Sequence, residues 1–384
     1  MPAPRKTSRQ RARTHYLPAH QSTVLVLQGG GALGAYQAGV YEGMEEAGLS
    51  PDWVTGVSIG AINAALIAGN APADRLPRLR EFWDLVSSGL PLAVPAEMDL
   101  LRMVFNRWSA SASAAFGVPG FFVPRVPPPM LSPHGSHGAL SLYDTSPLRD
   151  TLHRLVDFDL INERRTRLAV GAVEVRTGNS KYFDNHDSKV NFGPEHVMAS
   201  GALPPGLPPV YVMNVPHWDG GLVSNTPLWY VLDDSAHLDA LIVQVDLFSA
   251  RGELPANLDQ VLEREKDIHY SSKTRSNTRR VEEMANLRTA LSRLMEKLPP
   301  TLHDDPDYKL LQAKLGQQRQ ITIAHLINRR FAHSTNSKDY EFSRTTVREL
   351  WQAGLDDMRR TCAHPDWLIA TEVESGVRVV DLSR

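Results

Sequence analysis

The sequence of 384 residues contains very little cysteine and no long apolar run. Cys362 is the one cysteine, so no disulfide can form within the chain, and we expect a reducing compartment. No stretch approaches the roughly 18 to 20 apolar residues of a transmembrane helix. The formal net charge is only −2, which gives no reason to expect a nucleic-acid partner. We therefore expect a soluble, cytoplasmic protein.

The first 22 residues also lack the apolar segment of a secretory signal. Their basic side chains are Arg5, Lys6, Arg9, Arg11 and Arg13. We expect residues 1–22 to form a flexible basic arm. Basic residues at a membrane surface attract anionic lipid by about 1 kcal/mol each. The arm is therefore either a disordered tail or a peripheral contact with an anionic membrane.

The next part of the chain changes character along its length. Residues 23–87 contain two short apolar segments, each leading through glycine into a helical pattern. Such strand-loop-helix units, with alternating later elements, predict an α/β fold whose mainly parallel sheet is layered by helices. Residues 88–145 are rich in proline and aromatic side chains. We interpret them as an insertion, either a packed surface excursion or a lid or acyl-binding cap.

Residues 251–384 are predicted to form a mainly helical C-terminal region. The pattern is helical over residues 258–298, where apolar side chains are spaced three and four apart, at Met284, Leu287, Leu291, Leu294 and Leu298. We expect this stripe to pack against the preceding domain, and a seam between the copies of a homo-oligomer is the alternative. Residues 320–328 are predicted as a strand and residues 343–360 as a helix.

A serine between two glycines follows the apolar segment at residues 53–55 and precedes a helical pattern at residues 61–68. The motif reads G-V-S-I-G and places Ser58 between Gly56 and Gly60. A nucleophilic serine needs a turn sharp enough to lift its hydroxyl out of the sheet, and a Cβ at either glycine would collide with the neighbouring backbone. The motif also arises by chance, so the neighbouring segments must show whether Ser58 is a catalytic serine.

A glycine-rich loop, G-G-G-A-L-G at residues 29–34, lies between an apolar segment and a helical pattern. Backbone amides at such a helix N-terminus are unpaired and suit an anion. Because Gly29, Gly31 and Gly34 also fit the dinucleotide fingerprint, the anion is either a pyrophosphate or the oxyanion of a tetrahedral intermediate. A dinucleotide site needs an acid at the end of the second strand, whereas Asp52 stands at its start, so the oxyanion is favoured.

A third motif lies far downstream, where Asp219 ends a predicted strand and is followed by Gly220 and Gly221. By itself this pattern is typical of an ordinary Asp-Gly turn. Its combination with the glycine loop and the serine turn points to a catalytic site instead.

In their order and separation, the three motifs resemble those of the patatin-like phospholipase family. The resemblance covers about residues 23–250 and includes G-G-L-V-S-N-T-P after Asp219 and A-S-G-A-L-P-P at residues 199–205. It implies a catalytic domain over residues 23–250. The region after residue 250 is similar to the extension of a bacterial subgroup.

By this resemblance, Ser58 is the nucleophile and Asp219 the general base of a Ser-Asp dyad that hydrolyses lipid esters without metal, cofactor or histidine. The oxyanion hole is implied for Gly29, Gly30, Gly31 and Gly34, with backbone amides as donors. Many relatives carry Lys or Arg where this chain has Leu33, which leaves head-group preference open. A solvated carboxylate is a poor base for an alcohol, so we expect a desolvated pocket that raises the pKa of Asp219.

Two other hypotheses for the site are compatible with the sequence. A Ser-His-Asp esterase of the α/β-hydrolase type would use His237, which follows Asp219 in the required order, although its elbow would come later in the sheet. His217 stands two residues before Asp219 and could orient the carboxylate. A non-catalytic lipid-binding module would need neither Ser58 nor Asp219.

Overall fold

The computed structural model describes residues 22–89, 99–234, 239–272, 274–315, 320–329, 335–364 and 377–380. The expected basic arm lies outside these residues except for Ser22, and His237 lies outside them as well.

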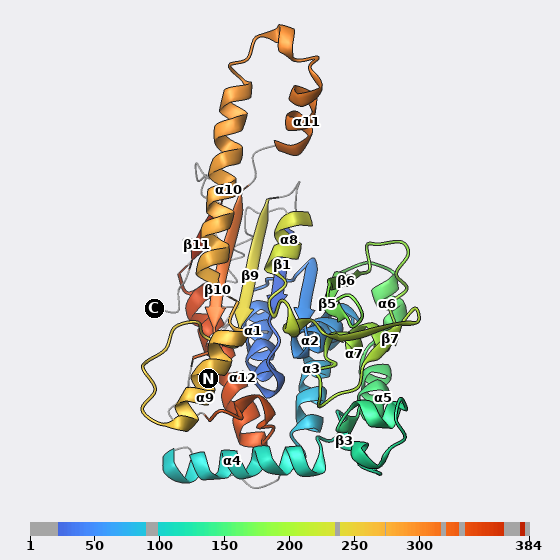
Figure 1. Cartoon of the computed structure of the whole chain (residues 1–384). Coiled ribbons are helices and arrows are strands. Elements are labelled where there is room, and N and C mark those ends of the chain that lie inside the picture. The colour runs from blue at the N-terminus through green and yellow to red at the C-terminus, as the bar shows by residue number, and fades with distance from the viewer. Residues whose placement is uncertain are drawn as a thin grey trace, which may run out of the picture.

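A nine-stranded sheet forms the centre of the molecule, with strand order β11-β10-β9-β1-β2-β5-β8-β7 and with β6 paired to β5 (Figure 1). The strands are β1 Ser22–Leu27, β2 Trp53–Val57, β5 Arg167–Glu174, β6 Ser180–Asp184, β7 Val210–Val212, β8 Val215–Asp219, β9 Ala240–Asp246, β10 Ile321–Ile327 and β11 Val377–Val380. The pairs from β11 to β5 are parallel, whereas β6, β7 and β8 pair antiparallel. The predicted α/β fold with a mainly parallel sheet is confirmed.

The central strand β1 shows why the sheet is covered on both faces. Its residues from Val24 to Leu27 are almost completely buried, and successive side chains of a strand point to opposite faces. Leu25 and Leu27 pack in one core with α1 (Ala35–Glu46) and α2 (Ile59–Ala68). Val24 and Val26 pack in a second core, where α8 (Leu228–Asp234) covers the sheet.

The insertion at residues 88–145 contains a long helix and a small two-stranded sheet. Helix α4 (Asp99–Phe116) lies across one end of the molecule, at the bottom of Figure 1. Strands β3 (Val123–Pro124) and β4 (Tyr143–Asp144) pair antiparallel. The further helices of this half are α3 Pro72–Val86, α5 Ser146–Leu155, α6 Phe158–Asn162 and α7 Pro194–Ser200.

The C-terminal region shares the core of the preceding domain. The predicted strand at residues 320–328 is confirmed as β10, which pairs with β9 and extends the sheet. The predicted helix at residues 343–360 is confirmed as α12 (Arg344–Cys362), which packs along α1. The two helices cross so closely that a Cβ at Gly39 would lie 1.9 Å from the Trp351 carbonyl oxygen. The glycine therefore permits this contact. The other helices of this region are α9 Leu258–Tyr270, α10 Thr274–Met295 and α11 Pro306–Leu315.

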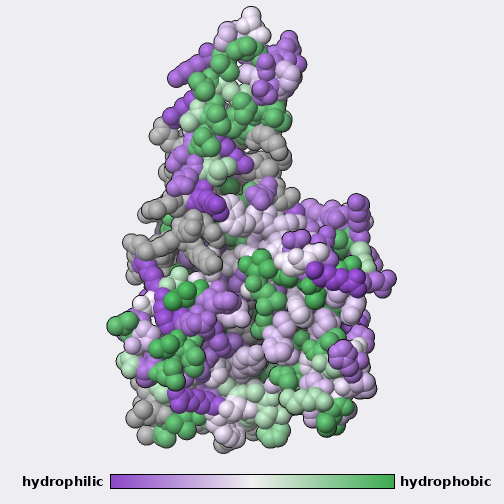
Figure 2. Space-filling view, viewed as in Figure 1, coloured by the Kyte–Doolittle hydropathy of each residue, from purple (hydrophilic) through white to green (hydrophobic). Residues whose placement is uncertain are grey.

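Helices α10 and α11 form an arm that projects from the body of the molecule (Figure 1). Within the predicted apolar stripe, Met284, Leu287 and Leu294 are 48%, 52% and 55% exposed. The expectation that the stripe packs against the preceding domain is therefore wrong for these residues, because α10 runs past the edge of the sheet. Figure 2 shows apolar residues gathered on this arm.

Among the described residues, no helix combines the length and apolar character needed to cross a bilayer.

Candidate active site

The serine motif forms a strained turn between β2 and α2. Ser58 has φ 57° and ψ −124°, a conformation that few non-glycine residues adopt. A Cβ at Gly56 would lie 2.2 Å from the Gly60 carbonyl oxygen, and a Cβ at Gly60 would lie 2.5 Å from the Leu27 carbonyl oxygen. Only glycine fits at these two positions, and the absence of a side chain at both allows the sharp turn.

The surrounding structure holds the strained serine in place. Its backbone N–H donates to both the carbonyl oxygen and the Oγ of Ser200, at 3.1 and 3.0 Å. The Ser200 hydroxyl in turn donates to the Gly171 carbonyl oxygen at 2.6 Å. Helix α2, which follows Ser58, is buried along its whole length and provides a rigid support.

Asp219 lies at the end of β8, where it reaches the serine turn. Its strand pairs with β5, with Asp219 opposite Ala172. A Cβ at Gly220 would lie 2.5 Å from the Gly171 carbonyl oxygen, so glycine is required for this close approach. The Asp219 carboxylate accepts a hydrogen bond from the Gly221 N–H at 2.7 Å, and it lines the same pocket as the Ser58 side chain.

The carboxyl group of Asp219 is in an unusual electrostatic environment. The side chain is buried, and the loss of hydration raises its pKa from 3.8 to about 6. The hydrogen bonds from Ser58 and Gly221 stabilise the charged form and limit this rise. A carboxylate of this basicity accepts a proton more readily than an ordinary surface aspartate.

The glycine loop lies beside the two side chains and presents backbone amides. The Gly29 N–H donates to the Asn225 carbonyl oxygen at 3.1 Å, so this amide is already used. Within the described residues, the amides of Gly30 and Gly31 have no such partner. Gly34 packs instead against Ile59 and Trp83, as the short distances from an added Cβ show. The loop therefore offers two donors, at Gly30 and Gly31.

A pocket of about 90 Å³ brings these groups together. It is lined by Ser58, Asp219 and residues 29–31, and its remaining lining is mostly apolar and aromatic, with Phe121, Phe122, Leu203, Leu207 and Phe248 among its members. The three distant segments thus converge on one pocket, to which they contribute Gly29, Gly30, Gly31, Ser58, Asp219 and Gly221. The other predicted glycines, Gly34, Gly56, Gly60 and Gly220, are not among its lining residues.

Comparison with known proteins shows the family of the chain. The model of the family described as Patatin-like phospholipase matches residues 25–232, more than half of the chain. The chain belongs to the patatin-like phospholipase family. A second model, described as Patatin phospholipase, matches residues 268–373.

Two curated proteins are similar over short segments. Lysophospholipase nte1 of Aspergillus terreus is 53% identical over 51 residues, which are 13% of this chain and 3% of that protein. Human Patatin-like phospholipase domain-containing protein 6 is 36% identical over 88 residues, which are 22% of this chain and 6% of that protein. The matched segments thus span only a small part of the length of these relatives.

Two solved structures share a distant likeness. VipD from Legionella pneumophila has 14% identity and a TM-score of 0.36, over 89% of this chain and 66% of that one. ExoU from the type III secretion system of Pseudomonas aeruginosa, solved in complex with SpcU, has 16% identity and a TM-score of 0.27, over 66% of this chain and 51% of that one.

Sequence reasoning missed the residues that tie the patatin-like loops together. Gln28 is fully buried, and its side-chain oxygen accepts from the Leu247 and Phe248 amides at 2.6 and 2.9 Å. The Asn225 side chain donates to the carbonyl oxygens of Gly29 and Tyr270, at 3.1 and 3.0 Å. A polar residue directly after an apolar strand was the available signal for Gln28. Nothing local indicates the partners of Asn225.

The C-terminal region also contributes to the pocket, which the sequence did not predict. The 3-10 helix η6 (Lys338–Tyr340) supplies Asp339 and Tyr340 to the lining, and Phe342 follows. Gly31 has φ 56°, and a Cβ there would lie 2.2 Å from the Asp339 carbonyl oxygen. The glycine loop and η6 are therefore in direct contact.

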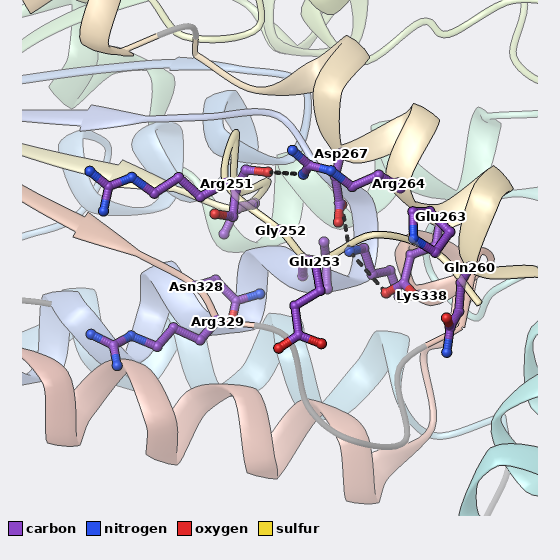
Figure 3. Close-up of a pocket in the computed structure, with 14 residues that line it drawn as sticks. Arg251, Gly252, Glu253, Gln260, Glu263, Arg264, Asp267, Asn328, Arg329 and Lys338 are labelled. Atoms are coloured by element: carbon purple, nitrogen blue, oxygen red, sulfur yellow. Dashed lines mark hydrogen bonds and ion pairs between the residues drawn. The ribbon is translucent and has the colours of Figure 1, made fainter. Parts of the chain in front are cut away.

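A larger polar cavity of about 490 Å³ lies beside this contact (Figure 3). In it, Lys338 Nζ lies 2.6 Å from an oxygen of Asp267 and 3.4 Å from one of Glu263. Arg264 donates to the carbonyl oxygen of Ser249 at 3.0 Å. The lining lacks the nucleophile and base found in the smaller pocket, so we assign the chemistry to the smaller one. These ion pairs hold η6 against α9.

Within the part of the chain that the structure describes, neither His217 nor a cluster of metal-binding side chains forms a second site. The His217 ring nitrogen donates to the Val215 carbonyl oxygen at 2.8 Å, and the ring packs on Phe183. Desolvation by burial lowers the pKa of His217. No hydrogen bond links it to Asp219 in the described part of the chain. No cluster of three or more metal-ligating side chains occurs among the described residues either.

Proposed function

We propose that this patatin-like chain hydrolyses carboxylic esters of lipids through a Ser-Asp dyad. The observation that carries the proposal is that Ser58 and Asp219 line the same pocket, where burial raises the pKa of the Asp219 carboxyl to about 6. Membership of the family supports the class of reaction and of substrate. The two unused amides of Gly30 and Gly31 support an oxyanion hole beside the nucleophile.

The proposed reaction proceeds through an acyl-enzyme. Asp219 takes the proton of the Ser58 hydroxyl as Oγ attacks the ester carbonyl carbon, and the negative charge that forms on the carbonyl oxygen is stabilised by the Gly30 and Gly31 amides. The intermediate then collapses, the proton passes from Asp219 to the leaving alkoxide, and the alcohol departs. Water repeats the sequence on the acyl-enzyme and releases the fatty acid.

The surface near the pocket supports access from lipid. Among the residues after α4, Val126, Met130 and Leu131 are 93%, 89% and 75% exposed. Between residues 108 and 142, Arg125 is the one Lys, Arg, Asp or Glu, and it pairs with Asp144 at 3.5 Å. An apolar face with so little charge fits the surface of a lipid aggregate. We propose that this face, and not only the N-terminal arm, meets the lipid.

Activity of point variants tests the proposal. Ser58→Ala and Asp219→Asn should each lower kcat on a soluble p-nitrophenyl ester by about 10³-fold or more, without adding in the double variant, because the two residues act as one unit. The control is His217→Ala, which removes a buried polar side chain from the strand that carries Asp219. This variant should keep most of the activity. The wild-type rate should rise with pH to a plateau, with an apparent pKa of about 6, because only ionised Asp219 is a base.

Two outcomes would contradict the dyad. Full activity in Ser58→Ala would show that another residue is the nucleophile. A folded His237→Ala variant as inactive as Ser58→Ala would favour the Ser-His-Asp alternative.

A further inference from the structure

A second apolar cavity lies behind one wall of the catalytic pocket. It has a volume of about 280 Å³ and lies between the C-terminal turn of α4 and the end of α3. Val86, Ala112, Val118 and Phe342 are among its lining residues. Phe342 lines the catalytic pocket as well, so the two cavities lie on either side of this ring.

The wall between the cavities is aromatic and is anchored on α4. The Phe342 ring packs edge-on against Phe121, with centroids 6.0 Å apart. The neighbouring Glu341 carboxylate accepts a hydrogen bond from the hydroxyl of Ser109 in α4 and another, at 3.0 Å, from the Ser343 N–H. The backbone beside Phe342 is therefore fixed, which leaves rotation of the side chain as the simplest way to join the cavities.

The lining of the second cavity is suited to a hydrocarbon chain. It contains no charged residue, and Ser113 is its one polar side chain. The cavity opens beside Phe116, which is 81% exposed, and Val123, which is 41% exposed. These residues adjoin the apolar face proposed above to meet lipid.

The size of the catalytic pocket makes an extension necessary for a long substrate. Pockets for small molecules usually have about 300 to 1,000 Å³. The pocket at Ser58, at about 90 Å³, holds the ester group and a short chain only. Together with the cavity behind Phe342, the space reaches the lower end of the usual range.

We propose that the cavity under α4 is the binding site for the fatty acyl chain of the substrate and that the Phe342 side chain gates the passage to it. The proposal rests on the proposed function and specifies its substrate as an ester of a medium or long acyl chain. Each methylene that leaves water on entering the cavity favours binding about fourfold. The cavity then sets the preference for chain length.

Blocking the cavity from α4 tests the proposal. Ala112 is partly exposed and lines the cavity, so Ala112→Trp fills the space without rebuilding the core. Ala115 lies on the same helix, is exposed and does not line the cavity, so Ala115→Trp is the matched control. For Ala112→Trp we expect kcat/KM on p-nitrophenyl dodecanoate to fall by about tenfold or more, with that on the butanoate ester within about twofold of wild type. Ala115→Trp should change neither.

Equal effects of Ala112→Trp on both esters, or no effect on either, would overturn the proposal. Phe342→Ala gives a second test, because removal of the gate should raise the dodecanoate-to-butanoate ratio of kcat/KM by about threefold or more. An unchanged or lowered ratio in folded Phe342→Ala would contradict the gate.

A binding measurement separates this proposal from the proposed function. Ser58→Ala removes the nucleophile and leaves the cavity intact, so it can be titrated with dansyl-labelled undecanoic acid even if the enzyme hydrolyses no ester. Adding Ala112→Trp should weaken binding by about tenfold, and adding Ala115→Trp should not. Equal affinity in all three proteins would refute the acyl site whatever the activity of the wild type.

Discussion

At the scale of single residues, the site depends on a carboxyl group placed where it is poorly solvated. Asp219 is buried in a mostly apolar pocket, where the Gly221 N–H and the Ser58 side chain stabilise its charged form and offset part of the lost hydration. Its pKa is therefore raised to about 6, and it remains ionised at neutral pH. This arrangement provides a base for Ser58, but a buried charge reduces the stability of the fold.

The cost of this charge predicts a pH-dependent gain in stability for Asp219→Asn. Because the folded pKa is raised, the folded protein binds the proton more tightly than the unfolded chain, so stability is highest below pH 4 and falls as pH rises to about 6. The shift from 3.8 to about 6 corresponds to roughly 3 kcal/mol. Asp219→Asn should therefore be more stable than wild type at pH 8 by up to this amount, and similar to it at pH 4, in urea unfolding.

Asp144→Asn provides a control of opposite sign. Hydrogen bonds from Ser146 lower the pKa of Asp144, so its ionised form stabilises the fold. This variant should lose stability at pH 8. A loss of stability in Asp219→Asn at pH 8 would show that the Asp219 carboxylate is well solvated or well paired, contrary to the account.

Sequence reasoning succeeded for residues whose requirements are local. A Cβ at Gly56 would collide with the carbonyl oxygen of Gly60, four residues further along the chain, and the sequence shows glycine on both sides of Ser58. The family resemblance placed Gly29 in the oxyanion hole together with Gly30 and Gly31, whereas the Gly29 amide donates to the Asn225 carbonyl oxygen, far along the chain. Such a contact depends on how distant segments pack, which no local pattern encodes.

At the scale of elements, the helix pair α1 and α12 couples the glycine loop to the C-terminal region. Helix α1 continues from the loop, and α12 follows the residues that carry η6 and Phe342. The helices approach through small residues, with Gly39 under the Trp351 carbonyl and Gly354 under that of Tyr36. The elements on either side of the catalytic pocket are thus held by one close helix crossing.

Gly39→Ala tests this crossing by the sign of its effect. In an ordinary helix, replacing glycine by alanine stabilises by roughly 0.5–1 kcal/mol. Here the new Cβ would lie 1.9 Å from a backbone oxygen, so the helices must separate, and overpacking of this kind costs about 1–3 kcal/mol. We expect a lower Tm in thermal unfolding. A Tm equal to or above that of wild type would show that α12 can move away from α1 at little energetic cost. The crossing would then not fix the position of η6.

At the scale of the whole molecule, the sequence predicted a catalytic domain over residues 23–250 and a separate C-terminal region. The structure shows one continuous sheet that has strands from both. Strand β10 was predicted from its apolar pattern, but its place beside β9 follows from pairing across distant residues. The contribution of Asp339, Tyr340 and Phe342 to the pocket has the same origin. A pattern along the chain identifies an element, and only the assembled fold shows which site that element serves.

The arm formed by α10 and α11 illustrates the converse case. Its apolar stripe has the spacing of a packed helix, yet Met284, Leu287 and Leu294 are about half exposed. Periodicity shows that one face is apolar and does not show whether another element covers it. A seam in a homo-oligomer stays a prediction for this surface.

The central claim is that Ser58, activated by Asp219, forms the covalent acyl-enzyme. The most direct test is intact-protein and peptide mass spectrometry after reaction with an alkyl fluorophosphonate, which phosphonylates an activated serine. We predict one adduct on wild type, at Ser58, no adduct on Ser58→Ala, and labelling of Asp219→Asn slowed by about 10³-fold or more. An adduct on another residue, or equal labelling of Ser58→Ala and wild type, would contradict the account.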